Sequence, residues 1–179
     1  TRQFGFLRLM NLGDWMYVAL GLIFLDLVIY LQHILFHSIP VLWRLHRMHH
    51  ADLELDVTSG TRFHPIEIMI SMFIKWSAIL LSGVSPLTVL LFEIILNGMA
   101  MFNNSNIFIP TSVDKILRYI VITPSLHRIH HSTLISEYNS NYGFNFSIWD
   151  RLLGTLKTDY YGKLTLGLPL FRDPKYLRL

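Results

Sequence analysis

A chain of 179 residues with 52% hydrophobic and only 15% charged side chains is one domain in length and too apolar for an ordinary soluble fold, which indicates a membrane protein. Because it contains no cysteine, disulfides and thiolate metal ligation are excluded, and any metal must be held by nitrogen or oxygen. The net charge of +3 is not gathered into a basic run or stripe, which argues against a nucleic-acid partner and favours a charge bias toward one membrane face.

The chain starts at Thr1, without the charged segment and cleavage site that a signal peptide requires. We therefore expect residues 1–179 to form one membrane-embedded domain whose natural chain begins further upstream.

The first apolar stretch covers residues 15–37 and predicts a helix of roughly 35 Å, enough to cross a hydrocarbon core of about 30 Å. Ser38 and Pro40 should end it, because proline disfavours helix in the residue before it. Asp26 lies on the same face as His33 and His37. It is expected either to orient His33 through an intervening group or to pair with Lys75 of another helix.

Two further apolar stretches, residues 66–82 and 86–101, are joined by a turn at 83–86. Each is short for a bilayer, so the pair predicts either two spans or a re-entrant hairpin. Each also carries a polar stripe. The stripe of the first stretch consists of Glu67, Ser71 and Lys75, and that of the second consists of Glu93, Asn97 and Asn104. The first stripe is interpreted as a structural seam, whereas the second would turn Asn104 toward the histidines.

No later stretch is long enough to cross a membrane; residues 113–123 predict a short amphipathic helix, and 137–179 predict loops and short helices. The predicted fold is therefore all-α: an integral membrane protein with about three embedded helices and a histidine-rich helical cap. A hairpin that returns to the side on which the first helix ends places residues 38–65 and 102–179, and all nine histidines, on one face.

That face would also carry most of the 15 basic residues, which predicts that it is cytosolic. The basic residues assigned to it are Arg44, Arg47, Arg62, Lys115, Arg118, Arg128, Arg151, Lys157, Lys163, Arg172, Lys175 and Arg178.

Eight histidines fall into three short boxes with the spacings HxxxH, HxxHH and HxxHH; they are His33, His37, His46, His49, His50, His127, His130 and His131. In a helix such spacings place imidazoles on one surface, and the two HxxHH boxes resemble equivalent half-sites. Eight imidazoles exceed the needs of one ion, so two metals are expected. His64 is as consistent with a structural role beside the ligands as with ligation.

Other functions leave different patterns. The chain has no HExxH motif, so the carboxylate base of a zinc metalloprotease is missing. A metal carrier or sensor would have ligands near the bilayer midplane, and a b-type cytochrome would have paired histidines on facing spans. A role for the histidines in pH sensing or surface polarity is disfavoured by three boxes on one face.

These boxes occur with Arg-Phe-His-Pro-x-Glu at 62–67, Asn-Tyr-Gly at 141–143 and Trp-Asp-Arg-Leu-Leu-Gly-Thr at 149–155. Together they resemble the fatty acid hydroxylase/sterol desaturase superfamily over about residues 26–157, with a tail like the bacterial sterol desaturase-like and alkylglycerol monooxygenase branches. The resemblance implies a non-haem di-iron centre, held by the eight box histidines, that uses O2 to hydroxylate or desaturate a lipid C–H bond.

One position departs from that pattern. Asn104 stands where many family members have a further histidine, and an amide oxygen is the poorer iron ligand. His64 or a water could replace it, and a catalytically weak or inactive member, or a membrane protein that only binds metal, is the alternative.

The lipid itself, whether sterol, fatty acyl chain, ether lipid or carotenoid, is left open, as are the residues that bind it. No motif for flavin, haem or nicotinamide is present, so electrons should come from a separate donor such as a ferredoxin, a cytochrome b5-like protein or a flavoprotein reductase. With the bacterial resemblance, the expected location is an inner membrane with the boxes facing the cytoplasm.

Overall fold

The computed structural model describes residues 5–10, 13–170 and 172–173, and in that part of the chain all regular elements are helices. In chain order they are η1 (Phe6–Met10), α1 (Asp14–Ser38), α2 (Pro40–His46), η2 (His49–Ala51), η3 (Ser59–Thr61), α3 (Pro65–Ser82), α4 (Pro86–Asn104), α5 (Thr111–Leu117), α6 (Pro124–His130), α7 (Ile135–Tyr138) and α8 (Ile148–Leu152). Extended pairing among the described residues is limited to two isolated bridges. The all-α prediction is confirmed.

Three helices, α1, α3 and α4, are long and apolar enough to cross a membrane, as predicted. With 25, 18 and 19 residues they reach about 37, 27 and 28 Å, close to or beyond the hydrocarbon thickness of about 30 Å. The lengths of α3 and α4 match the spanning alternative.

The turn between α3 and α4 is fixed by local chemistry. Gly83 takes a left-handed conformation with φ +71°, which ends α3, and the Ser85 side chain accepts a hydrogen bond from the backbone N–H of Thr88 at the start of α4. The Tyr17 hydroxyl donates to the Gly83 carbonyl. This turn is thereby held against the first half of α1, far from the histidines.

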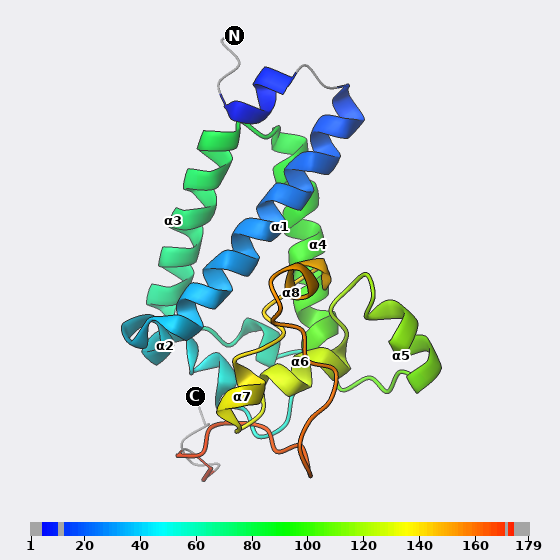
Figure 1. Ribbon diagram of the computed structural model, residues 1–179. Coiled ribbons are helices and arrows are strands. Elements are labelled where there is room, and N and C mark those ends of the chain that lie inside the picture. Colours follow the sequence, from blue (N-terminus) through cyan, green and yellow to red (C-terminus); the bar gives the residue numbers. More distant parts are fainter. Residues whose placement is uncertain (1–4, 11–12, 171, 174–179) are drawn as a thin grey trace.

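α1 is the central helix of the three, and α3 and α4 lie on either side of it (Figure 1). In the most apolar window, 39% of α1 is buried but only 17% of α3 and of α4. Leu25, Ile29, Ala78 and Phe92 form part of the core where the three helices meet. The outer faces of α3 and α4 remain apolar and exposed, as expected for surfaces that contact lipid.

η1 lies at the end of the bundle that carries the turn between α3 and α4, where Arg8 Nε donates to the Gly83 carbonyl (Figure 1). The other elements gather at the opposite end, where α1 and α4 end and α3 begins (Figure 1). Residues 39–64 and the described part of 105–173 thus share one face, as the sequence predicted. Of the basic residues assigned to this face, Lys175 and Arg178 lie outside the described residues.

The helix predicted over residues 113–123 is wrong in its extent, because α5 ends at Leu117. Beyond it the chain pairs with a distant loop: the N–H of Ile122 donates to the Asn145 carbonyl, and the N–H of Ser147 donates to the Ile120 carbonyl. Those hydrogen bonds replace the helical ones.

Candidate metal centre

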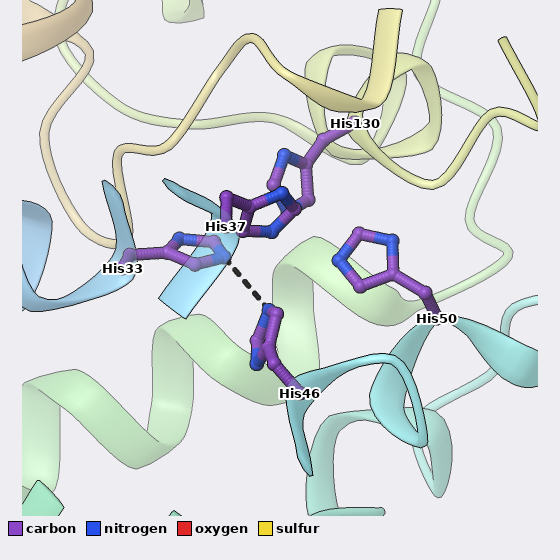
Figure 2. Close-up of side chains that lie close together, drawn as sticks. All are labelled: His33, His37, His46, His50 and His130. Atoms are coloured by element: carbon purple, nitrogen blue, oxygen red, sulfur yellow. Dashed lines mark hydrogen bonds between the residues drawn. The ribbon is translucent and has the colours of Figure 1, made fainter. Parts of the chain in front are cut away.

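Four elements bring five imidazoles together at the cap: His33 and His37 from α1, His46 from α2, His50 from η2 and His130 from α6. In this five-histidine group the ligand nitrogens all lie within 4.8 Å of one another. Figure 2 shows the rings turned toward a common centre. Four of the residues are buried and His37 is half-buried.

Protein oxygens hold the outer nitrogens of four of these rings. The Nδ1–H groups donate as follows: His33 to the Tyr142 carbonyl at 2.8 Å, His46 to Glu67 Oε1 at 2.6 Å, His130 to the Ser140 carbonyl at 2.7 Å and, more loosely, His37 to Asn139 Oδ1 at 3.4 Å. A carbonyl oxygen only accepts, so Nδ1 carries the proton and Nε2 keeps its lone pair. This is the tautomer in which a histidine ligates a metal through Nε2.

The inner nitrogens lack protein donors. Nε2 of His33 and Nε2 of His46 lie 3.1 Å apart, and the buried Nε2 atoms of His37, His50 and His130 have no hydrogen-bond partner among the described residues. A buried polar atom without a partner costs free energy, and several such atoms facing one centre indicate a missing ligand. The donor set therefore fits a metal ion.

A second cluster, the three-histidine group, consists of His49, His127 and His131, whose ligand nitrogens also lie within 4.8 Å of one another. The Nδ1–H of His49 donates to the Ser59 carbonyl at 3.1 Å. His127 and His131 face each other through Nε2 at 3.1 Å, and the Nδ1 of each has no partner among the described residues. All three side chains are buried.

The two groups are neighbours. The rings of His50 and His131 stack with their centroids 4.3 Å apart, and the centroids of His46 and His49 are 5.4 Å apart. All eight histidines singled out in the sequence therefore converge into one region that is able to hold metal.

The interpretation of the two HxxHH boxes as equivalent half-sites is wrong, because each box contributes to both groups. His46 and His50 join one group and His49 the other. The reason is that α2 ends at His46 and the next two histidines lie on η2, so this box is not one continuous α-helix.

Burial sets the protonation of the cap histidines. Removal from water lowers the pKa of His49 to about 3. The same cause, joined by repulsion between neighbouring imidazoles, lowers the pKa of the following residues well below the usual range: His46, His50, His127, His130 and His131. The rings are thus neutral at physiological pH, the state that a metal requires.

The Asn-Tyr-Gly segment fixes the carbonyl that holds His33. Asp150 accepts hydrogen bonds from the backbone N–H groups of Tyr142 and Gly143, both at 2.8 Å, and from the Thr155 hydroxyl at 2.6 Å. A Cβ at Gly143 would lie 2.7 Å from the Asp150 carboxylate, so only glycine fits there. Asp150 and Thr155 of the string at 149–155 thus hold the backbone of the Asn-Tyr-Gly segment in place.

Glu67 was not predicted to touch the histidines, yet it orients His46. From the sequence alone, Glu67 was interpreted as part of a structural seam, because it lies on the same helical face as Ser71. The useful signal was its place two residues after Pro65, at the start of α3, where the helix enters the cap.

The structure also places the three other candidates. Asp26 accepts a hydrogen bond from Trp149 Nε1 at 2.8 Å and thereby ties α1 to α8, whereas Lys75 pairs with Glu93 rather than with Asp26. His64 belongs to neither histidine group; its Nδ1 accepts from the backbone N–H of Ile66 and caps α3.

Asn104 is buried at the end of α4 and donates from Nδ2 to the Ala100 carbonyl at 2.9 Å. Its Oδ1 has no partner among the described residues. A Cβ at Gly60 would lie 3.2 Å from Asn104 Nδ2. Asn104 is therefore beside the loop whose Ser59 carbonyl holds His49.

A sequence model of the fatty acid hydroxylase family matches residues 18–155, which include all eight histidines. The chain belongs to this family. Among its relatives, the ornithine lipid hydroxylase OlsE of Rhizobium tropici is 37% identical over 139 residues, which are 77% of this chain and 41% of the relative. Fatty acid hydroxylase relatives also include human cholesterol 25-hydroxylase, 26% identical over 79% of this chain and 52% of the relative, and the alkylglycerol monooxygenase of Xenopus tropicalis, 28% identical over 79% and 30%.

The chain thus spans about half or less of the length of these curated relatives. No solved structure matches it significantly.

Proposed function

We propose that this chain is the metal-binding core of an O2-dependent, non-haem di-iron enzyme that hydroxylates a membrane lipid. The observation that carries the proposal is the convergence of eight imidazoles into two adjoining groups, with inner nitrogens left unpartnered. Membership of the fatty acid hydroxylase family supports lipid oxidation. The relatives are named hydroxylases or monooxygenases, which favours hydroxylation over desaturation.

Two groups imply two ions. The five-histidine group would hold one and the three-histidine group the other, the latter with coordination positions open to water or O2. Asn104 Oδ1 is the proposed additional oxygen donor for the second ion, since it is buried and has no hydrogen-bond partner among the described residues. Histidine and oxygen donors without thiolate suit iron.

Two iron ions, when bound, would supply the O2 activation and electron transfer that cleaving an unactivated C–H bond requires. The protein's own contribution is positional. The buried cap excludes water from the ligands, and Glu67 with the carbonyls of Tyr142 and Ser140 fixes the imidazole tautomers.

Substrate access is provided by a cavity of about 240 Å³ that lies between α1, α3 and α4. His33, His46 and His49 form part of its wall, so the cavity joins the metal-binding end to the membrane-embedded part of the protein. A lipid segment in this cavity would present its carbon to the centre away from bulk water.

The electron donor is proposed to be a separate protein: a ferredoxin, a cytochrome b5-like protein or a flavoprotein reductase. The cytoplasmic face of a bacterial inner membrane is the proposed location of the cap, from its basic residues.

The experiment is to purify the chain in detergent, load it with ferrous iron, and supply O2, a reductase system and candidate lipids. Ornithine lipid, cholesterol and an alkylglycerol are the first substrates to try, since they are named in the relatives. Gain of one oxygen atom by a lipid, seen by mass spectrometry and absent without iron, is expected. Iron binding without any oxygenated lipid would instead support a metal-binding protein without turnover.

A further inference from the structure

The cavity beside the histidines has a polar wall inside the membrane-spanning part. Its polar lining includes Glu67, Ser71 and Lys75 of α3, Glu93 and Asn97 of α4, and Gln32 of α1. The stripe on α3 was expected to be a structural seam, but it faces the cavity. At about 240 Å³ the cavity is below the usual 300–1,000 Å³ of whole-ligand pockets, so it suits part of a lipid.

An ion pair closes one side of this cavity. Lys75 Nζ lies 2.5 Å from Glu93 Oε1, and the two side chains are 16% and 35% exposed. Lys75 lies eight residues along α3 from Glu67, or about 12 Å from the histidine end. Because α3 and α4 pack on α1 rather than on each other, this pair bridges them at depth in the membrane.

A simple brace between two helices does not require charge. Ionised side chains within a bilayer are costly, and an apolar pair of similar volume often stabilises as well as a buried ion pair does. Charged residues retained at such positions mark substrate pathways. The ion pair lines the same cavity as the histidines, which makes recognition of a charged substrate group the more economical role.

The same wall also contains two buried oxygen atoms that accept no hydrogen bond from the described part of the chain. Glu67 Oε2 and Gln32 Oε1 are buried and lack partners among the described residues, although Gln32 Nε2 donates to the Ser71 hydroxyl at 2.9 Å and Glu67 Oε1 accepts from His46. Buried acceptors without donors are costly. With the Glu93 carboxylate, the wall therefore suits a group rich in N–H donors.

We propose, given the lipid hydroxylase function above, that Gln32, Glu67, Lys75 and Glu93 bind a zwitterionic polar group of the substrate whose cation is a protonated amine. Its ammonium pairs with Glu93, while its anion, a carboxylate or a phosphate, pairs with Lys75. Gln32 and Glu67, nearer the histidine end, offer acceptors to N–H or O–H groups of the rest of the substrate. The internal ion pair of the zwitterion and the pair between Lys75 and Glu93 are exchanged for two new pairs, so no net charge is added at low dielectric. A lone cation or anion would add charge there.

The need for both an N–H-bearing ammonium and an anion limits the class of lipid that this wall would bind. A sterol or a plain acyl chain brings no ammonium to the wall, and a choline lipid is zwitterionic but has no N–H to donate. Both groups are present in N-acylated diamino-acid lipids, which keep a free carboxylate and a side-chain ammonium, and in ethanolamine phospholipids. The two classes differ in the anion.

The test is lipid selection by the iron-loaded protein in nanodiscs that contain equal amounts of ornithine lipid, phosphatidylethanolamine, phosphatidylcholine and phosphatidylglycerol. Lipids retained after delipidation are quantified by mass spectrometry. We expect at least about tenfold enrichment of an amine-bearing zwitterion over phosphatidylcholine, because the choline group has no N–H and cannot form the close, hydrogen-bonded charge pair with Glu93. Enrichment of ornithine lipid assigns the carboxylate, and enrichment of phosphatidylethanolamine assigns the phosphate. Equal retention of all four would overturn the inference.

Two double variants distinguish binding of the substrate by Lys75 and Glu93 from a purely structural role of this ion pair in joining α3 to α4. Lys75→Met/Glu93→Leu replaces the pair with apolar side chains, and Lys75→Glu/Glu93→Lys keeps a pair with reversed polarity. We expect both to keep bound iron and a thermal midpoint close to that of the unmodified protein but to lose the enrichment. Enrichment that survives in the folded, iron-loaded variants contradicts the proposal. An unmodified protein that binds no iron would instead count against the proposed function itself.

Discussion

The two histidine groups differ in how the protein holds them. In the five-histidine group, four Nδ1 atoms donate to protein oxygens, so the rings are oriented before any metal arrives. In the three-histidine group only His49 is anchored in this way, while His127 and His131 face each other and leave Nδ1 unpartnered. We infer that the first group would hold its ion tightly and that the second would hold its ion more loosely, because fewer of its rings are oriented in advance.

The largest effect should come from His130→Ala, which removes a ligand of the tight site. We expect bound iron to fall from two ions per chain to at most one, with lipid oxidation abolished, because affinity should drop by more than the roughly 10–100-fold typical for loss of a ligand-orienting residue. Iron analysis after gel filtration measures this. Two ions retained in a folded variant would show that His130 is not a ligand.

His127→Ala removes a candidate ligand of the three-histidine group. One ion should again be lost, but the ion that remains should resist a chelator, since it sits in the five-histidine group. The residual ion of His130→Ala should be stripped readily. Chelator titration of both variants side by side is the measurement, and equal lability of the two would refute the distinction between tight and loose sites.

Glu67→Ala tests orientation without removing a ligand. Loss of the carboxylate that fixes His46 should weaken iron binding by about 10–100-fold. Glu67→Gln keeps an oxygen that accepts from Nδ1 and should retain most of the affinity, which makes it the matched control. A competition assay against a metal-sensitive dye gives both constants; equal weakening in the two variants would point to a general packing defect.

The mildest effect is a dependence on pH. In the metal-free protein, burial lowers the pKa of His49 to about 3 and the pKa values of His50 and His130 well below the ordinary 6.5. The unfolded chain therefore takes up protons first as the pH falls, so stability is full above about 6.5 and declines toward acid. Thermal unfolding in detergent between pH 8 and 5 should show a falling midpoint. A midpoint that rises toward acid would contradict neutral buried imidazoles.

Much of this arrangement was predictable, for identifiable reasons. The apolar lengths and Pro65, Pro86 and Gly83 define the helices, and the return of the hairpin to one side places the histidines together without any knowledge of contacts. The family resemblance was carried by motifs that the structure explains, such as Gly143 packed against Asp150.

The features that the sequence did not predict depend on how the helices are placed relative to one another. The end of α2 at His46 divides a box whose spacing predicts one continuous helix. The partner of Lys75 depends on the position of α4 relative to α3 along the bundle axis. The hydrogen bond between Asp26 and Trp149 joins residues 123 positions apart. Such pairings are set by packing of the whole bundle, and a single sequence does not encode them in its local pattern.

The two histidine groups are proposed to hold a pair of iron ions. Iron quantification combined with Mössbauer spectroscopy of the reconstituted protein tests this proposal most directly. We predict two iron ions per chain in nitrogen-rich coordination and no haem Soret band; a single ion, or none, would contradict it.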